Sequence, residues 1–304
     1  MRRLFLLLFI GPALSAQEYI DLFNVSYSIT PETRYDAGMG NTRIQQAEAN
    51  LLLPIPINPH IAVITGFMGN LNRLEPDPDD PALSVYSAGA LLGFNLEHGG
   101  GWSSLHVAIP RVASAVEFGR TQFQFGTLQL LQHNSSPLKH ISFGAYLNAE
   151  EFGLLVVPLF GFYYRKPDDS WEVSALLPSR AEWNFRVSDR YRAGLAFEGL
   201  GSSYPIRTEN YGEAYVQRAA NDLSAFLQYR PVPSLLFTLK SGYSFFRSYR
   251  IYDADDRVDI SFANVYFKDP RAVLNRSVSD GFFLNFKFIY RYHLSANQIV
   301  DPED

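Results

Sequence analysis

Charged side chains recur at alternate positions of strand-like segments, on the side opposite an apolar face. In the segment Tyr191–Gly199 the charges are Arg192 and Glu198, and in Gly281–Leu294 they include Lys287. Alternate residues of a strand point to the same face. Charges gathered inside a closed sheet predict a channel that guides a polar solute. The residues expected to line this lumen are Glu48, Glu172, Arg186, Arg192, Glu198, Arg230, Lys240, Lys287 and Arg291.

The same charges allow a second interpretation, in which they only neutralise one another. Charges removed from water must be paired. A barrel of 12 to 14 strands is narrow enough for long side chains to fill much of its interior. The lumen would then be plugged, and the protein would have a structural or surface-interaction role. His106, in the segment Trp102–Ile109, is also placed in the lumen by its alternation.

Enzymatic and metal chemistry have little support in the sequence. His133, Asn134 and Ser135 are adjacent, but in a predicted turn, where Asn and Ser are ordinary residues. The chain has no cysteine and no pair of histidines at metal-binding spacing. The acidic runs 75–80 and 253–256 lack the glycine and distal glutamate of a calcium-binding loop. We therefore expect no enzyme, no cofactor and no metal site.

The segment Gly281–Leu294 shows the longest alternation in the chain. A strand of about 10 residues can cross a tilted membrane barrel, and aromatic residues collect where such a strand meets the lipid interface. Only Phe283 and Ile289 break the rule. We expect this strand to close a barrel against Tyr19–Ile29. The residues expected to face lipid are Phe282, Leu284, Phe286, Phe288, Tyr290 and Tyr292.

Alternation along the whole chain predicts 14 strands, or 12 if short neighbouring segments form single bent strands. The fold class is therefore all-β, with one antiparallel transmembrane barrel. The predicted strands are Tyr19–Ile29, Ile44–Leu53, Ile61–Leu71, Tyr86–Leu96, Trp102–Ile109, Thr121–Gln132, Lys139–Asn148, Leu154–Tyr164, Trp171–Leu177, Glu182–Val187, Tyr191–Gly199, Tyr215–Arg230, Leu235–Tyr249 and Gly281–Leu294.

The connections between these segments sort by length. Six short ones, near 54–59, 97–101, 133–138, 165–170, 188–190 and 231–234, alternate with a set that contains the long ones. Outer-membrane barrels have short periplasmic turns and longer extracellular loops, so both termini should be periplasmic. The long connections are 30–43, 72–85, 110–120, 201–214 and 250–280. The last could hold a small helix or fold into the lumen.

The ends of the chain indicate export. Arg2 and Arg3 precede the apolar run Leu4–Ile10, and small residues near Ala16 offer a cleavage site, as in a signal peptide. That run is too short to anchor the chain as a helix. We expect a cleaved signal peptide at 1–16, a barrel at 17–294 and a polar periplasmic tail at 295–304.

The composition fits such a barrel. Only 19% of residues are charged and 15% are aromatic, a low and a high share for a soluble domain. A net charge of −5 argues against nucleic acid as a partner. The expected partners are outer-membrane lipid and lipopolysaccharide, with the oligomeric state left open. A soluble β-sandwich would show the same alternation, with its apolar face turned inward.

Two local patterns carry a family resemblance. One is the run 154–189, with Pro158, Gly161, Trp171 and Leu177-Pro178; the other is Ser241-Gly242-Tyr243. On these the chain resembles the outer-membrane β-barrels of diderm bacteria, and more narrowly an uncharacterised barrel family of unknown function. The resemblance implies insertion by the barrel-assembly machinery, which reads terminal aromatics such as Tyr290 and Tyr292. The 10-residue tail departs from that pattern.

Overall fold

The computed structural model describes residues 19–31, 33–35, 40–78, 80–116, 121–263, 269–276 and 278–293. The predicted signal peptide (1–16) and tail (295–304) lie outside the described residues. No helix in the described ranges is long and apolar enough to cross a membrane.

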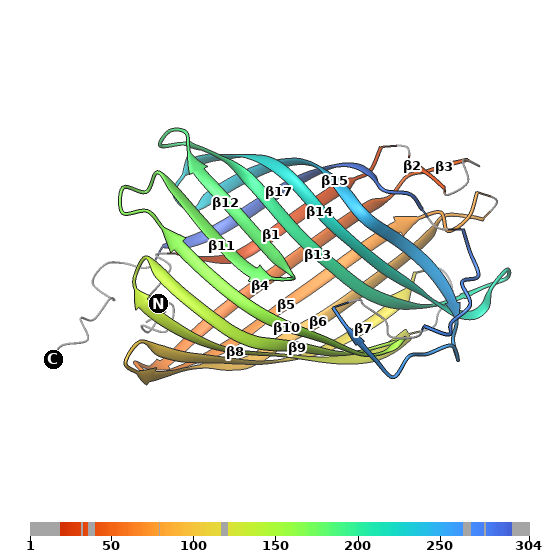
Figure 1. The fold of residues 1–304 in the computed structure, drawn as a ribbon, viewed down its shortest axis with the longest axis horizontal. Helices are drawn as coiled ribbons and strands as arrows, with labels where there is room; N and C mark the ends of the chain where they lie inside the picture. The colour runs from red at the N-terminus through yellow and green to blue at the C-terminus, as the bar shows by residue number, and fades with distance from the viewer. Residues whose placement is uncertain are drawn as a thin grey trace, which may run out of the picture.

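The described chain forms an antiparallel barrel of 14 strands (Figure 1). Its last strand pairs with its first, from Tyr19 opposite His293 to Ile29 opposite Leu284, so the predicted closure is confirmed. The barrel strands are β1 (Tyr19–Ile29), β4 (Gln45–Asn58), β5 (Ile61–Leu74), β6 (Leu83–Gly99), β7 (Trp102–Ala115), β8 (Thr121–Ser136), β9 (Lys139–Glu150), β10 (Gly153–Arg165), β11 (Trp171–Leu177), β12 (Arg180–Arg186), β13 (Tyr191–Thr208), β14 (Gly212–Val232), β15 (Leu235–Asp253) and β17 (Gly281–His293).

Several strands run further than alternation predicts. The connection expected at 201–214 is instead a hairpin, in which β13 and β14 pair as far as Thr208 and Gly212. Here both faces are buried, as at Ser203 and Ile206, so polar and apolar residues no longer alternate. The connection expected at 54–59 is also mostly strand. β1 pairs with β4 only as far as Leu51. Pro54 and Pro56 lie beyond this point, so their missing backbone N–H groups remove no hydrogen bond to β1.

Three short strands lie outside the antiparallel ladder. β2 (Thr33–Arg34) and β3 (Asn41–Thr42) form a small hairpin after β1. β16 (Ile260–Phe262) belongs to the long connection between β15 and β17 and pairs in parallel with β10.

β16 occupies a place where the regular wall is incomplete. β11 and β12 have seven residues each, and their hairpin ends part of the way along the barrel (Figure 1). β11 therefore covers β10 only from Phe160 to Arg165, whereas β16 pairs with Leu154–Val156. Part of the longest loop thus completes the wall.

Gly153 allows this loop to approach. Its φ is +125°, and a Cβ there would lie 1.8 Å from the Val258 carbonyl oxygen. The Val258 amide also donates to the Phe152 carbonyl at 2.8 Å. A side chain at this position must therefore push the loop backbone away from β10.

We predict that Gly153→Ala costs about 1–3 kcal/mol locally and detaches β16. Trypsin should then cut the folded barrel faster after Arg257, which lies in this loop. Gly212→Ala is the matched control, because its φ of +65° is also positive but nothing lies within 4 Å of the added Cβ. Equal cleavage rates in the two variants would contradict the prediction.

Candidate functional site

The exterior of the barrel is covered by large apolar side chains. On β17 the outward residues include Phe282, 68% exposed, and Phe286, 55% exposed. Phe283 and Ile289, the two exceptions to the alternation, are buried on the opposite side. A bilayer requires a closed ladder of backbone hydrogen bonds and an apolar outer face, and this chain has both. The protein is a transmembrane β-barrel. The other outward residues of β17 are Leu284, Phe288, Tyr290 and Tyr292, all exposed or half-exposed.

The prediction that His106 lies in the lumen is wrong. His106 is exposed on the outer face of β7, because the inward positions of this strand are held by apolar residues such as Val107 and Ile109. Its Nε2 contacts the Ser104 hydroxyl at 3.0 Å and its Nδ1 contacts the side chain of Gln129. These residues form a polar patch within an otherwise apolar belt.

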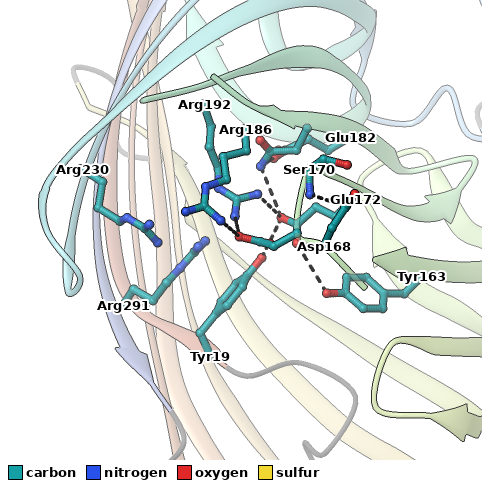
Figure 2. Close-up of polar contacts among 12 residues, drawn as sticks. Tyr19, Tyr163, Asp168, Ser170, Glu172, Glu182, Arg186, Arg192, Arg230 and Arg291 are labelled. Atoms are coloured by element: carbon teal, nitrogen blue, oxygen red, sulfur yellow. Dashed lines mark hydrogen bonds and ion pairs between the residues drawn. The ribbon is translucent and has the colours of Figure 1, made fainter. Parts of the chain in front are cut away.

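We call the end of the barrel with the short connections the short-turn end, and the opposite end the long-loop end. At the short-turn end a hydrogen bond spans the lumen. The Tyr19 hydroxyl on β1 donates to Glu172 on β11 at 3.1 Å, although these strands are not neighbours in the sheet (Figure 2). The Arg291 guanidinium lies 3.5 Å from the centre of the Tyr19 ring and pairs with Asp21 at 2.6 Å. We call Tyr19, Asp21, Glu172 and Arg291 the polar bridge.

The other arginines predicted for the lumen lie around this end (Figure 2). Arg192 pairs with Asp169 at 2.7 Å, and Arg186 pairs with Asp189 at 2.6 Å. Arg230 donates to the Asp189 carbonyl at 3.1 Å. Arg186 and Arg230 therefore contact turn residues at the rim and are absent from the cavity lining.

Beyond the polar bridge the barrel encloses a cavity of about 510 Å³. Its lining includes five of the predicted charges: Glu172, Glu198, Lys240, Lys287 and Arg291. Glu48 lines a smaller recess of about 40 Å³, together with Lys240 and Lys287.

Three charged lining residues were missed by the sequence analysis: Asp21, Arg180 and Glu182. A bulge between Asp21 and Phe23 reverses the alternation at the start of β1, which hides the inward position of Asp21. Arg180 fell in a predicted connection. Glu182 occupies an alternate position with Asn184, so the same pattern test could have found it.

A buried ion pair lies in the lumen nearer the long-loop end. Arg111 on β7 pairs with Glu150 on β9 at 2.8 Å, and their side chains are 10% and 1% exposed. Glu150 also accepts from the backbone amide and hydroxyl of Ser203 on β13, at 2.8 and 2.6 Å. Since β13 is not a neighbour of β9 in the sheet, its outer half must lie across the lumen.

An apolar cluster continues this closure. Tyr204, next to Ser203, donates to Asn70 on β5 at 2.8 Å. Around it pack buried side chains from the outer ends of many strands and from two connections. They include Tyr35, Ile44, Leu74, Val85, Ile206, Val216, Ile251 and Val278. We call this cluster, with the Arg111–Glu150 pair, the outer layer.

The acidic runs tie the connections together above the outer layer. Asp80 accepts from Tyr211 at the tip of the β13–β14 hairpin at 2.5 Å, and Asp77 pairs with Arg276 at 3.7 Å. Among the described residues no group of three or more histidine, aspartate or glutamate side chains could hold a metal ion.

Comparisons with known proteins return barrels at very low identity. No family model and no curated protein sequence matches the chain. An outer-membrane channel from Pseudomonas putida F1 is 7% identical, over 89% of this chain and 94% of its own, with a TM-score of 0.44. The toluene transporter TodX of P. putida is 8% identical over 94% and 93%, with a TM-score of 0.39. A Pseudomonas aeruginosa FadL homologue is 10% identical over 94% and 93%, with a TM-score of 0.36.

We predict that Arg111→Met destabilises the barrel by about 3–5 kcal/mol, because Glu150 would be left charged and unpaired in a buried place. Arg111→Met combined with Glu150→Gln should cost less, since no uncompensated charge remains. Urea unfolding in lipid vesicles, followed by tryptophan fluorescence, measures both. A loss below about 1 kcal/mol for the single variant would show that the pair is dispensable.

We predict that His106→Leu stabilises the barrel by about 1 kcal/mol, because an imidazole facing lipid is replaced by hydrocarbon. Gln129 keeps its hydrogen bond to Thr127 at 2.7 Å in this variant. The same unfolding measurement applies. A comparable loss of stability would mean that the polar patch stabilises the barrel.

Proposed function

We propose that the protein is a transporter that admits a small polar solute to the lumen cavity. The solute would pass when either the polar bridge or the outer layer rearranges. It combines a wall suited to the membrane with a charged internal space. The support comes from one observation: a cavity of about 510 Å³ inside the barrel is lined by the polar bridge and by five further charged residues, Arg180, Glu182, Glu198, Lys240 and Lys287. A volume of this size is typical of sites for small molecules.

The polar bridge is suited to opening. It consists of a few side chains from β1, β11 and β17, joined by one tyrosine hydrogen bond and one ion pair. Rotation of the Tyr19 side chain would break the bond across the lumen without disturbing the backbone ladder. Side-chain rotations of this kind are much faster than movements of whole strands.

A plugged barrel without transport is the second candidate. The outer layer favours it, because buried apolar residues and the Arg111–Glu150 pair fill the lumen over many strands. In that case the connections tied together by Asp77 and Asp80 would form the surface that meets other molecules.

Conductance across a planar bilayer separates these candidates. We predict that Tyr19→Ala raises the frequency of conductance steps at least several-fold, because it removes the bond to Glu172 across the lumen. Tyr27→Ala is the matched control, since Tyr27 is an exposed tyrosine on the lipid side of the same strand. Lys287→Glu should change the ion selectivity of any step that passes the cavity. Bilayers that stay silent with all three variants would refute transport and favour the plugged barrel.

Solute entry can be followed independently, because the chain contains no cysteine. Ser174 lines the cavity, and the next residue, Ala175, lies on the other side of the strand. A small charged thiol reagent should modify Ser174→Cys in the folded barrel, and faster when Tyr19→Ala is also present. Ala175→Cys, which faces lipid, should react slowly in both backgrounds.

A further inference from the structure

Two of the cations in the cavity are already neutralised by neighbours. Lys240 donates to Glu198 at 2.7 Å, and Arg291 pairs with Asp21 at 2.6 Å. These pairs join adjacent or nearby strands and account for four of the charged lining residues. They stabilise the wall and leave little charge for a ligand.

Charges of both signs remain without such partners. Lys287 on β17 and Arg180 on β12 make no hydrogen bond or ion pair with any described residue, and both line the cavity. Glu182, two residues from Arg180 on the same side of β12, has only a hydrogen bond from Asn184 at 3.4 Å. The cavity therefore presents two cations and one carboxylate that no close ion pair holds, although Lys287 acts electrostatically on both Glu182 and Glu198 across the cavity.

The same cavity has an apolar part. Leu52 and Leu91 contribute to it from β4 and β6, and Phe226 and Ile289 from β14 and β17. Phe226 and Ile289 are both 6% exposed, on the side of their strands that faces the lumen. A solute with an apolar body would gain free energy by packing on these side chains, because apolar surface of both the solute and the cavity is removed from water.

We propose that the solute is a small zwitterion with an apolar body, of the type of a free amino acid or short peptide. Its ammonium group would contact Glu182, its carboxylate would contact Lys287 and Arg180, and its body would pack on the apolar part of the cavity. This inference rests on the proposed function, since it names the solute that the transporter carries.

The distribution of charge disfavours ligands with only one charge. A simple carboxylate would meet Glu182, and close by Glu48, which lines the adjoining recess with Lys287. A simple amine would meet Lys287 and Arg180, the two cations without a close ion pair. Either ligand would leave charges of one sign unpaired after water has been displaced, which is costly. A zwitterion satisfies both signs at once.

Three probes of nearly equal shape test this assignment. Phenylalanine carries both charges, 3-phenylpropanoate lacks the ammonium group, and phenethylamine lacks the carboxylate. Calorimetric titration of the barrel in phospholipid nanodiscs should give a dissociation constant for phenylalanine that is roughly tenfold to hundredfold lower than for either analogue.

Charge-removing variants identify the contacts. Glu182→Gln should make phenylalanine bind no better than 3-phenylpropanoate, and Lys287→Gln should make it bind no better than phenethylamine. Lys139→Gln is the control, since Lys139 is an exposed lysine at the short-turn end, outside the cavity lining. This control should leave all three dissociation constants unchanged.

The outcomes are distinct from those of the transport experiments. Equal binding of phenylalanine and 3-phenylpropanoate, or no binding of any probe, would overturn the zwitterion assignment even if the barrel conducts. Selective binding of phenylalanine to an electrically silent barrel that also excludes the thiol reagent would support the ligand class and refute transport. In that case the cavity would be a binding site without passage.

Discussion

The pairing of β17 with β1 is the constraint on which the rest of the structure depends. Without it, two strand edges would expose backbone amides and carbonyls to hydrocarbon, where each unpaired group costs several kcal/mol. Once the ladder is closed, every residue points either to lipid or to the interior. Charged groups must then lie inside or at the rims, and their mutual arrangement decides what the interior can hold.

The interior is divided unevenly. Toward the short-turn end, side chains alone narrow it, through the polar bridge and the arginines that contact Asp169 and Asp189. Toward the long-loop end, backbone also enters, because the outer half of β13 leaves the wall and bonds to β9 and β5. The short β11–β12 hairpin makes room for this departure, and β16 covers part of the edge of β10 that remains.

Sequence alternation predicts the strands well wherever one face meets lipid and the other meets polar atoms. The closing pair follows from it, and the barrel has 14 strands, one of the two numbers that alternation allowed. It fails where both faces are buried, as at Ser203 and Ile206, because both sides of the strand then carry similar residues. It fails at Asp21, where a bulge reverses the alternation, and at His106, where polar side chains face lipid. Which charges lack a close ion pair, such as Lys287, depends on distances between strands far apart in the chain.

The inward course of β13 also limits how the barrel can respond to its contents. Its outer half is continuous with a wall strand and is paired along its length with β14. The outer half of β13 therefore cannot leave the lumen as a separate plug domain would. It can only bend, and the pivot would be near Gly199, where pairing with β12 ends at Glu198. The outer half of β13 is thus part of the wall, and any movement of it about Gly199 would change the shape of the wall beside the β11–β12 hairpin.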